Sequence, residues 1–107
     1  MPTTKEYFDR IQQKLSGIEG ISYRKMMGEY LVYYKDKVAG GLCDDRFLVK
    51  PVKSAGELLT DAEPELPYEG AKPMLRVDDS VSGEFILRLF EAMYDELPQP
   101  KHKGNTV

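Results

Sequence analysis

The spacing of apolar residues changes twice along this 107-residue chain, and these two changes constrain the fold more than any other feature. Before Ile21, apolar side chains recur at the three- and four-residue spacing of a helix. From Ile21 they form short β-rich runs separated by polar turns, and helical spacing returns near Asp78. A chain of this length supports one core, so we expect strands and helices to share a single domain.

Two helices are predicted from capping patterns. Thr3 and Glu6 have the spacing of a capping box, and the apolar residues that follow predict a helix over residues 4–17. Ser54 and Glu57 repeat this spacing and predict a short helix in the second half of the chain.

A last helix is predicted to begin near residues 78–82, where the candidate N-caps are Asp78, Asp79, Ser80 and Ser82. With Ser82 as the cap, Val81 and Ile86 take the positions of a hydrophobic staple. The following apolar residues fall on one stripe: Phe85, Ile86, Leu89, Phe90, Met93 and Leu97. Pro98 and Pro100 end this helix.

The middle of the chain is predicted to form an antiparallel meander. Five runs have strand character, at residues 21–27, 29–34, 38–43, 46–52 and 74–77. Residues 35–37 and 44–45 are predicted turns. Gly40 and Gly41 lower strand propensity and allow another backbone to approach closely. Residues 63–73 contain three prolines and a glycine, which predicts a loop.

These elements predict an α+β fold in the order α-β-β-β(-β)-α-β-α. We expect two layers, an antiparallel sheet of about five strands with helices on one face. Residues 1–98 are assigned to this domain, and residues 99–107 have no pattern and are predicted to form a disordered tail.

Residues that support catalysis are scarce. Cys43 is the only cysteine, and His102, the only histidine, falls in the predicted tail. A Cys–His mechanism needs the base within hydrogen-bond reach, so Cys43 is interpreted as a small buried residue. The acidic pairs at 44–45 and 78–79 are interpreted as a turn and a helix start, and no Gly-rich phosphate loop is present. We predict no enzymatic activity, no metal and no cofactor.

The charge is unevenly distributed. Residues 22–53 hold seven Lys or Arg against four Asp or Glu, whereas residues 54–100 hold three against eleven. In one interpretation each segment simply has a solvated surface. In the other, a basic central surface faces an acidic carboxyl-terminal helix and is available for self-association or a charged partner. No apolar run approaches the ~20 residues that span a bilayer, and no signal-peptide plan is visible, so we expect a cytoplasmic protein with no membrane contact.

Nucleic-acid binding is the alternative function. Basic residues alternate with aromatic ones over the predicted meander, and a basic aromatic sheet is a known way to hold single strands. The whole chain is acidic, with a pI near 5.2, which opposes contacts to a phosphate backbone.

Two segments resemble a known family. Residues 24–30 read Arg-Lys-Met-Met-Gly-Glu-Tyr, and residues 45–50 read Asp-Arg-Phe-Leu-Val-Lys. A helix precedes these two segments, and an aromatic strand, a polar turn and a second strand lie between them. In this order they resemble the amino-terminal domain of the competence regulator TfoX, also called Sxy. The resemblance extends over roughly residues 4–97, and the matching positions are Met27, Gly28, Tyr30, Phe47 and Lys50.

The resemblance implies a two-layer fold and supplies no catalytic residue. In the named regulators this domain precedes a second, helical domain, and we expect the present chain to be a stand-alone version without it. It also implies a small interaction domain that binds protein and is linked to transcription or competence regulation.

The binding surface is predicted on the sheet. Strand 29–34 has apolar side chains on both faces, and only one face can pack against helices in a two-layer fold. The predicted partner-binding residues are Tyr30, Val32, Tyr34, Arg46, Lys50 and Arg76. The partner is expected to be a protein, with a homodimer as one case. In the competing interpretation, the helix at 54–61 or the proline loop covers this face.

Overall fold

The computed structural model describes residues 3–26, 29–67 and 69–98. The elements run in the order α1 (Lys5–Lys14), β1 (Ile21–Met26), β2 (Glu29–Tyr34), β3 (Lys37–Leu42), β4 (Phe47–Val49), α2 (Lys53–Leu58), β5 (Pro64–Glu65), β6 (Met74–Val77), α3 (Gly83–Met93) and the 3-10 helix η1 (Tyr94–Glu96). This order confirms the predicted α+β class. Met27, Gly28 and the predicted tail lie outside the described residues.

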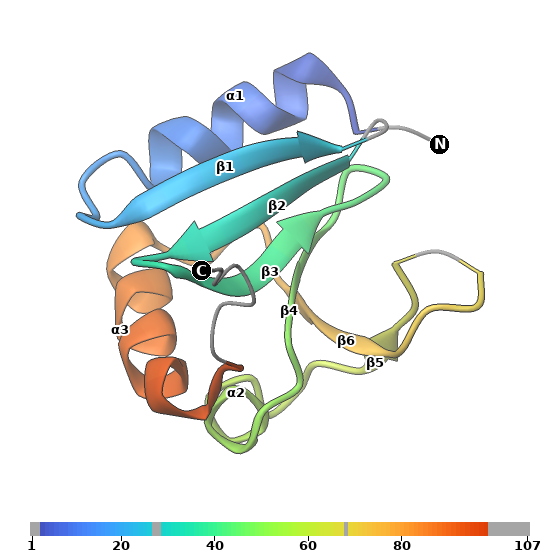
Figure 1. The fold of residues 1–107 in the computed structure, drawn as a ribbon, viewed down its shortest axis with the longest axis vertical. Coiled ribbons are helices and arrows are strands. Elements are labelled where there is room, and N and C mark those ends of the chain that lie inside the picture. The colour runs from blue at the N-terminus through green and yellow to red at the C-terminus, as the bar shows by residue number, and fades with distance from the viewer. Residues whose placement is uncertain (1–2, 27–28, 68, 99–107) are drawn as a thin grey trace, which may run out of the picture.

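The described strands form one antiparallel six-stranded sheet in the order β1-β2-β3-β4-β6-β5. The first four are joined in sequence, as the meander predicts. Figure 1 shows α1 alongside β1, and α3 on the side of the sheet where the β2–β3 turn lies. The sheet has one strand more than expected, because the two-residue β5 lies within the predicted proline loop. Its backbone pairs with β6 although it begins with a proline, as an edge strand permits.

The two tight turns of the meander use left-handed backbone. Asp44 and Asp45 have φ values of 54° and 56°, and the flanking Cys43 and Arg46 exchange two backbone hydrogen bonds of 2.9 and 3.0 Å. This two-residue hairpin matches the twist of its strands, and Asp tolerates the left-handed region better than most residues. Lys35 has a φ of 61° in the preceding turn.

Strand β3 is irregular and lies very close to its neighbours β2 and β4. Its pairing with β2 shifts register between Val32 and Tyr33, which is a β-bulge. At Gly40 a Cβ atom would overlap the carbonyl oxygen of Leu48, and at Gly41 it would lie 2.8 Å from the carbonyl oxygen of Tyr30. The predicted close approach of backbones at these two glycines is therefore confirmed.

One core joins α1, α3 and a single face of the sheet. Its fully buried members include Val32, Val49, Ile86, Leu89, Phe90 and Met93. Phe90 lies under Tyr34 and Phe47, with ring centroids 5.7 and 6.2 Å away. The predicted apolar stripe is confirmed as buried except at Phe85, which is only half-buried, and its last member, Leu97, lies beyond α3 and after η1.

Helix capping differs from the prediction in two of three helices. Ser82 caps α3, as expected, and accepts a hydrogen bond from the backbone of Phe85. In α1 the cap is Thr4, one residue beyond the expected position, because its hydroxyl accepts from the Tyr7 backbone. In α2 the N-cap is Val52, which makes no side-chain cap bond.

The serine expected to cap α2 instead bonds to the other end of the chain. Ser54 donates from its backbone nitrogen and its hydroxyl to the Glu96 carboxylate, at 2.8 and 2.9 Å. None of the helices within the described residues combines the length and apolar character needed to cross a membrane.

Candidate functional site

Three of the six predicted binding residues lie on the face of β2 that packs against the helices. Val32 is fully buried and Tyr34 is 2% exposed, and both belong to the core. The ring of Tyr30 stacks on Phe8 of α1, with centroids 4.0 Å apart. The prediction that Val32 and Tyr34 form an exposed surface is therefore corrected, whereas Tyr30 is half-buried and also lines a groove together with Leu31 and Gly41. Both faces of β2 are apolar, so the sequence pattern did not distinguish the covered face from the open one.

The three predicted basic residues differ in their surroundings. Arg46 Nη1 lies 2.9 Å from Oε1 of Glu65, and Arg46 Nη2 donates to the Pro67 carbonyl oxygen at 3.3 Å. Arg76 Nη1 lies 3.9 Å from Oε2 of Glu65. Arg46 thus ties the segment after β5 to the sheet. Lys50, in contrast, lines an open groove.

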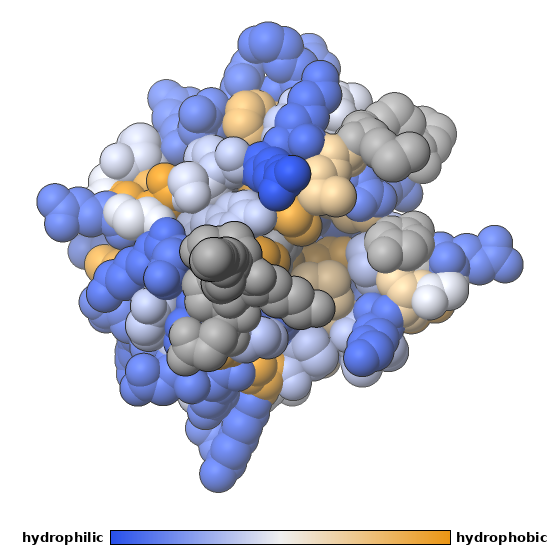
Figure 2. All heavy atoms as spheres, viewed as in Figure 1, coloured by the Kyte–Doolittle hydropathy of each residue, from blue (hydrophilic) through white to orange (hydrophobic). Residues whose placement is uncertain are grey.

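This outer-face groove, of about 400 Å³, lies on the sheet face turned away from α1 and α3. Leu31, Gly41 and Leu48 are paired across β2, β3 and β4 and form its floor together with Val38. Its wall is formed by Pro51, Pro67, Ala71, Pro73 and Met74. Figure 2 shows hydrophobic atoms, orange and tan, in a recess near the middle of the view, over the strands drawn as β3 and β4 in Figure 1.

The part of the proline loop that follows β5 forms one side of this groove. It is held by its carbonyl at Pro67, which lies 2.8 Å from Sγ of Cys43 and also accepts from Arg46. Leu48 is consequently only 1% exposed although it points away from the main core. Of the two segments expected to compete for this face, the loop borders it and α2 packs against α3 instead.

The groove has a different charge at each end. Glu29 precedes Leu31 by two residues on β2, so it lies at one end, beside Cys43. Lys50 comes directly after β4 and two residues after Leu48, so it lies at the other end, and Lys72 of the proline loop also lines the groove. Among the described residues, neither lysine ammonium group has an ion-pair or hydrogen-bond partner.

The thiol at the acidic end is protonated at neutral pH. Burial raises the pKa of Cys43 to about 11, and its hydrogen bond to Glu29 acts in the same direction. A thiol with this pKa is a poor nucleophile, because the thiolate is the reactive species.

Most aromatic side chains of the meander lie apart from the basic residues of the outer face, and the one close pair within the meander, among the described residues, is Lys35 over the Tyr34 ring, 5.3 Å from its centre. Tyr23 and Tyr30 contact Phe8, while Tyr34 and Phe47 contact Phe90, so all four rings lie on the helix side. On the outer face, Arg24 and Lys50 have only Tyr33 as an aromatic companion among the described residues of the meander. The stacking platform on which the nucleic-acid alternative depended is therefore not formed by these residues.

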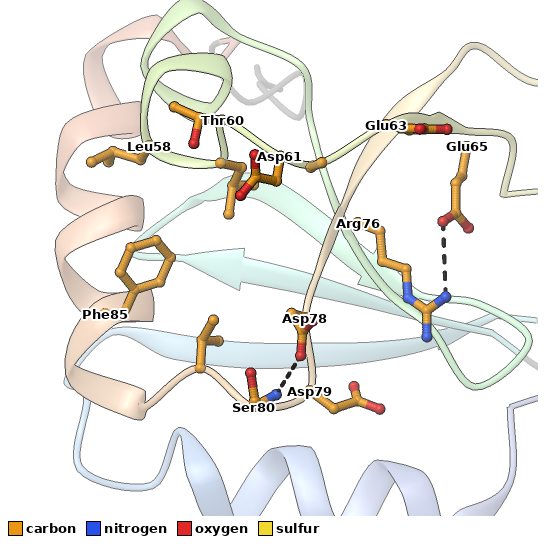
Figure 3. Close-up of a pocket in the computed structure, with 13 residues that line it drawn as sticks. Leu58, Thr60, Asp61, Glu63, Glu65, Arg76, Asp78, Asp79, Ser80 and Phe85 are labelled. Carbon is orange, nitrogen blue, oxygen red and sulfur yellow. Dashed lines mark hydrogen bonds and ion pairs between the residues drawn. The ribbon is translucent and has the colours of Figure 1, made fainter.

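A second hollow, of about 660 Å³, lies between the end of α2, β6 and the start of α3. Figure 3 shows its acidic lining residues Asp61, Glu63, Glu65, Asp78 and Asp79, with Arg76 pointing toward Glu65. Asp78 accepts from the Ser80 backbone, which lowers its pKa and fixes the turn before α3. Within residues 3–26, 29–67 and 69–98, no group of three or more His, Cys, Asp or Glu is arranged to hold a metal ion.

Comparison with known proteins found one informative relative. A protein of Spirochaeta aurantia, described as an uncharacterized 12.7 kDa protein in the trpE 5′ region, is 40% identical to this chain over 81 residues. The match covers 72% of this chain and 68% of the relative. No family model and no solved structure matches the chain.

Proposed function

The chain belongs to the family of the 12.7 kDa Spirochaeta aurantia protein, and we propose that it is a non-enzymatic interaction domain that binds a partner protein in the outer-face groove. The observation that carries this proposal is the apolar floor of the groove, where Leu31 and Val38 are only half-buried and none of the described helices covers them. An apolar hollow with charged groups at its rim is typical of a protein-binding site.

The Cys43 thiol supports an interaction role over a catalytic one. It is the only cysteine, its pKa is raised to about 11, and its hydrogen bonds go to Glu29 and the proline loop. Such a thiol contributes to the shape of the groove rather than to nucleophilic chemistry.

We also propose a relationship to the amino-terminal domain of TfoX. The order of elements supports it, because an initial helix is followed by the aromatic strand β2, the glycine-containing strand β3 and the apolar strand β4 that runs into Lys50. This proposed relationship implies that the partner belongs to the machinery of transcription or competence regulation.

The function is tested by comparing which partners three forms of the chain capture from native-cell extract. Val38→Glu places a charge in the groove, and Ser22→Glu places the same charge on the same sheet face but outside it. We expect wild type and Ser22→Glu to retain a common partner that Val38→Glu loses. Calorimetry with the purified partner then measures each affinity, and near-UV circular dichroism verifies that each variant is folded. Equal affinity of a folded Val38→Glu variant would contradict the proposal.

A further inference from the structure

We propose that the outer-face groove takes a short extended segment of its partner in which an aliphatic side chain is followed by a carboxylate. This inference rests on the proposed function and specifies the chemistry that the groove selects. It is carried by the apolar floor, by two lysines in the lining that have no partner among the described residues, and by the size of the hollow.

The floor determines the aliphatic part of the segment. Leu31 and Leu48 flank Gly41 at one level of the sheet, and Val38 continues the apolar surface toward Lys50. Prolines and Met74 enclose this surface from the side. A leucine- or isoleucine-sized side chain would displace water from the half-buried Leu31, Val38 and Met74, which is favourable in proportion to the apolar area buried, whereas Leu48 is already enclosed.

The two lysines determine which charge is expected in the bound segment. Lys50 and Lys72 share the groove lining, and neither pairs with a carboxylate among the described residues. A carboxylate from the partner would neutralise them beside an apolar surface, where the interaction is stronger than in bulk water. At the opposite end Glu29 already accepts from Cys43 and would repel a second carboxylate. The segment is therefore expected to bind with its acidic end toward Lys50.

The size of the groove favours a linear segment over a folded surface. Its volume of about 400 Å³ accommodates a few side chains, and the proline loop bounds it as a wall. A second copy that presented the same concave face would leave the hollow between the two copies unfilled, because neither face has a segment, among the described residues, that protrudes into the other. We therefore assign the site to a partner segment and treat self-association as an outcome of the test.

The probe for this test is a displayed library of random twelve-residue peptides, selected on the immobilised full chain. We expect enrichment of peptides with Leu, Ile or Met within two positions of Asp or Glu. The most enriched sequence is then synthesised with a fluorophore and titrated by anisotropy. Reversing both lysines, K50E with K72E, should weaken its binding at least about tenfold, which corresponds to ~1.4 kcal/mol. The matched control is K25E, because Lys25 is exposed on β1 and does not line the groove.

The outcomes separate this inference from the proposed function. One outcome is that the enriched peptides are neutral or basic, bind K50E/K72E as tightly as wild type and fail to bind Val38→Glu. This result would overturn the acidic segment and leave the groove as the binding site. Peptides that bind Val38→Glu unchanged, or no enrichment, would overturn both. Concentration-dependent dimerisation that is lost in Val38→Glu would assign the groove to a second copy and overturn the partner segment.

Discussion

The Sγ atom of Cys43 lies 2.9 Å from Oε2 of Glu29, so the single thiol of the chain faces a carboxylate at one end of the outer-face groove. Burial and this carboxylate together raise the pKa of the thiol. We expect native protein to react with iodoacetamide at pH 8 far more slowly than protein unfolded in urea. Glu29→Gln should accelerate the native reaction, because it removes the carboxylate charge while keeping a similar shape. Mass spectrometry of quenched time points measures both rates; equal rates in native and unfolded protein would contradict the assignment.

The same thiol should make stability depend on alkaline pH. Its pKa is about 11 in the folded chain against an ordinary value of 9.0, so the unfolded chain loses this proton first as pH rises. The stabilising contribution is therefore fully present below pH 9 and is lost as pH approaches 11. We expect the urea midpoint to fall over this range, and to fall less in Cys43→Ala. The difference between the two proteins is the informative quantity, since Tyr23, with a pKa of about 12, contributes equally to both.

Lys37 is a buried cation that secures the end of α3. Its side chain donates to the Tyr94 carbonyl oxygen at 3.0 Å, lies 4.2 Å from the centre of the Tyr94 ring, and is almost fully enclosed. Lys37→Met keeps the length and leaves that carbonyl without its donor, so we expect a loss of about 1–3 kcal/mol in unfolding free energy. The control is Lys25→Met, because Lys25 is exposed on β1 and makes no ion pair, side-chain hydrogen bond or cation–π contact among the described residues, so it should change stability by less than ~0.5 kcal/mol. Chemical denaturation of both variants provides the comparison.

Phe90 tests the packing of α3 against the sheet. It is fully buried between Tyr34 and Phe47, so Phe90→Ala should cost roughly 3–5 kcal/mol of unfolding free energy. Phe85→Ala, about one turn earlier at a half-buried position, should cost less. A loss below about 1 kcal/mol for Phe90→Ala would mean that another face of the helix meets the core.

Two glycines provide a paired test of the close approach between β3 and β4. A methyl group at Gly40 would overlap the backbone of Leu48 and lie 2.8 Å from Cα of Val49, so Gly40→Ala should destabilise by at least about 2 kcal/mol. Gly56 lies in α2, and a methyl group added there would meet no atom within 4 Å, so Gly56→Ala should stabilise by about 0.4–1 kcal/mol. Thermal melts that rank these variants in the opposite order would refute the packing of β3 on β4.

The predictable part of this fold came from local patterns. The hairpin at Asp44 and the cap at Ser82 each depend on neighbouring residues, and both formed as expected. Which face of β2 the helices cover depends on residues distant in sequence. Because both faces of β2 carry apolar residues, the sequence pattern did not indicate the covered face. The sequence predicted neither the tether from Cys43 to the proline loop nor the strand that begins at Pro64. The tether has a backbone carbonyl as its acceptor and the strand pairs through backbone groups, and such groups carry no residue-specific signal.

The strand order also sets an expected sequence of folding events. Each pairing from β1 to β4 joins neighbours in the chain through a short connection, so the meander can assemble from local contacts. The pairing of β4 with β6 instead closes a long loop from Val49 to Met74, and loop-closure entropy delays such contacts. Destabilising changes within β6 should therefore accelerate unfolding and leave the refolding rate nearly unchanged, whereas changes within the β2–β3 hairpin should slow refolding.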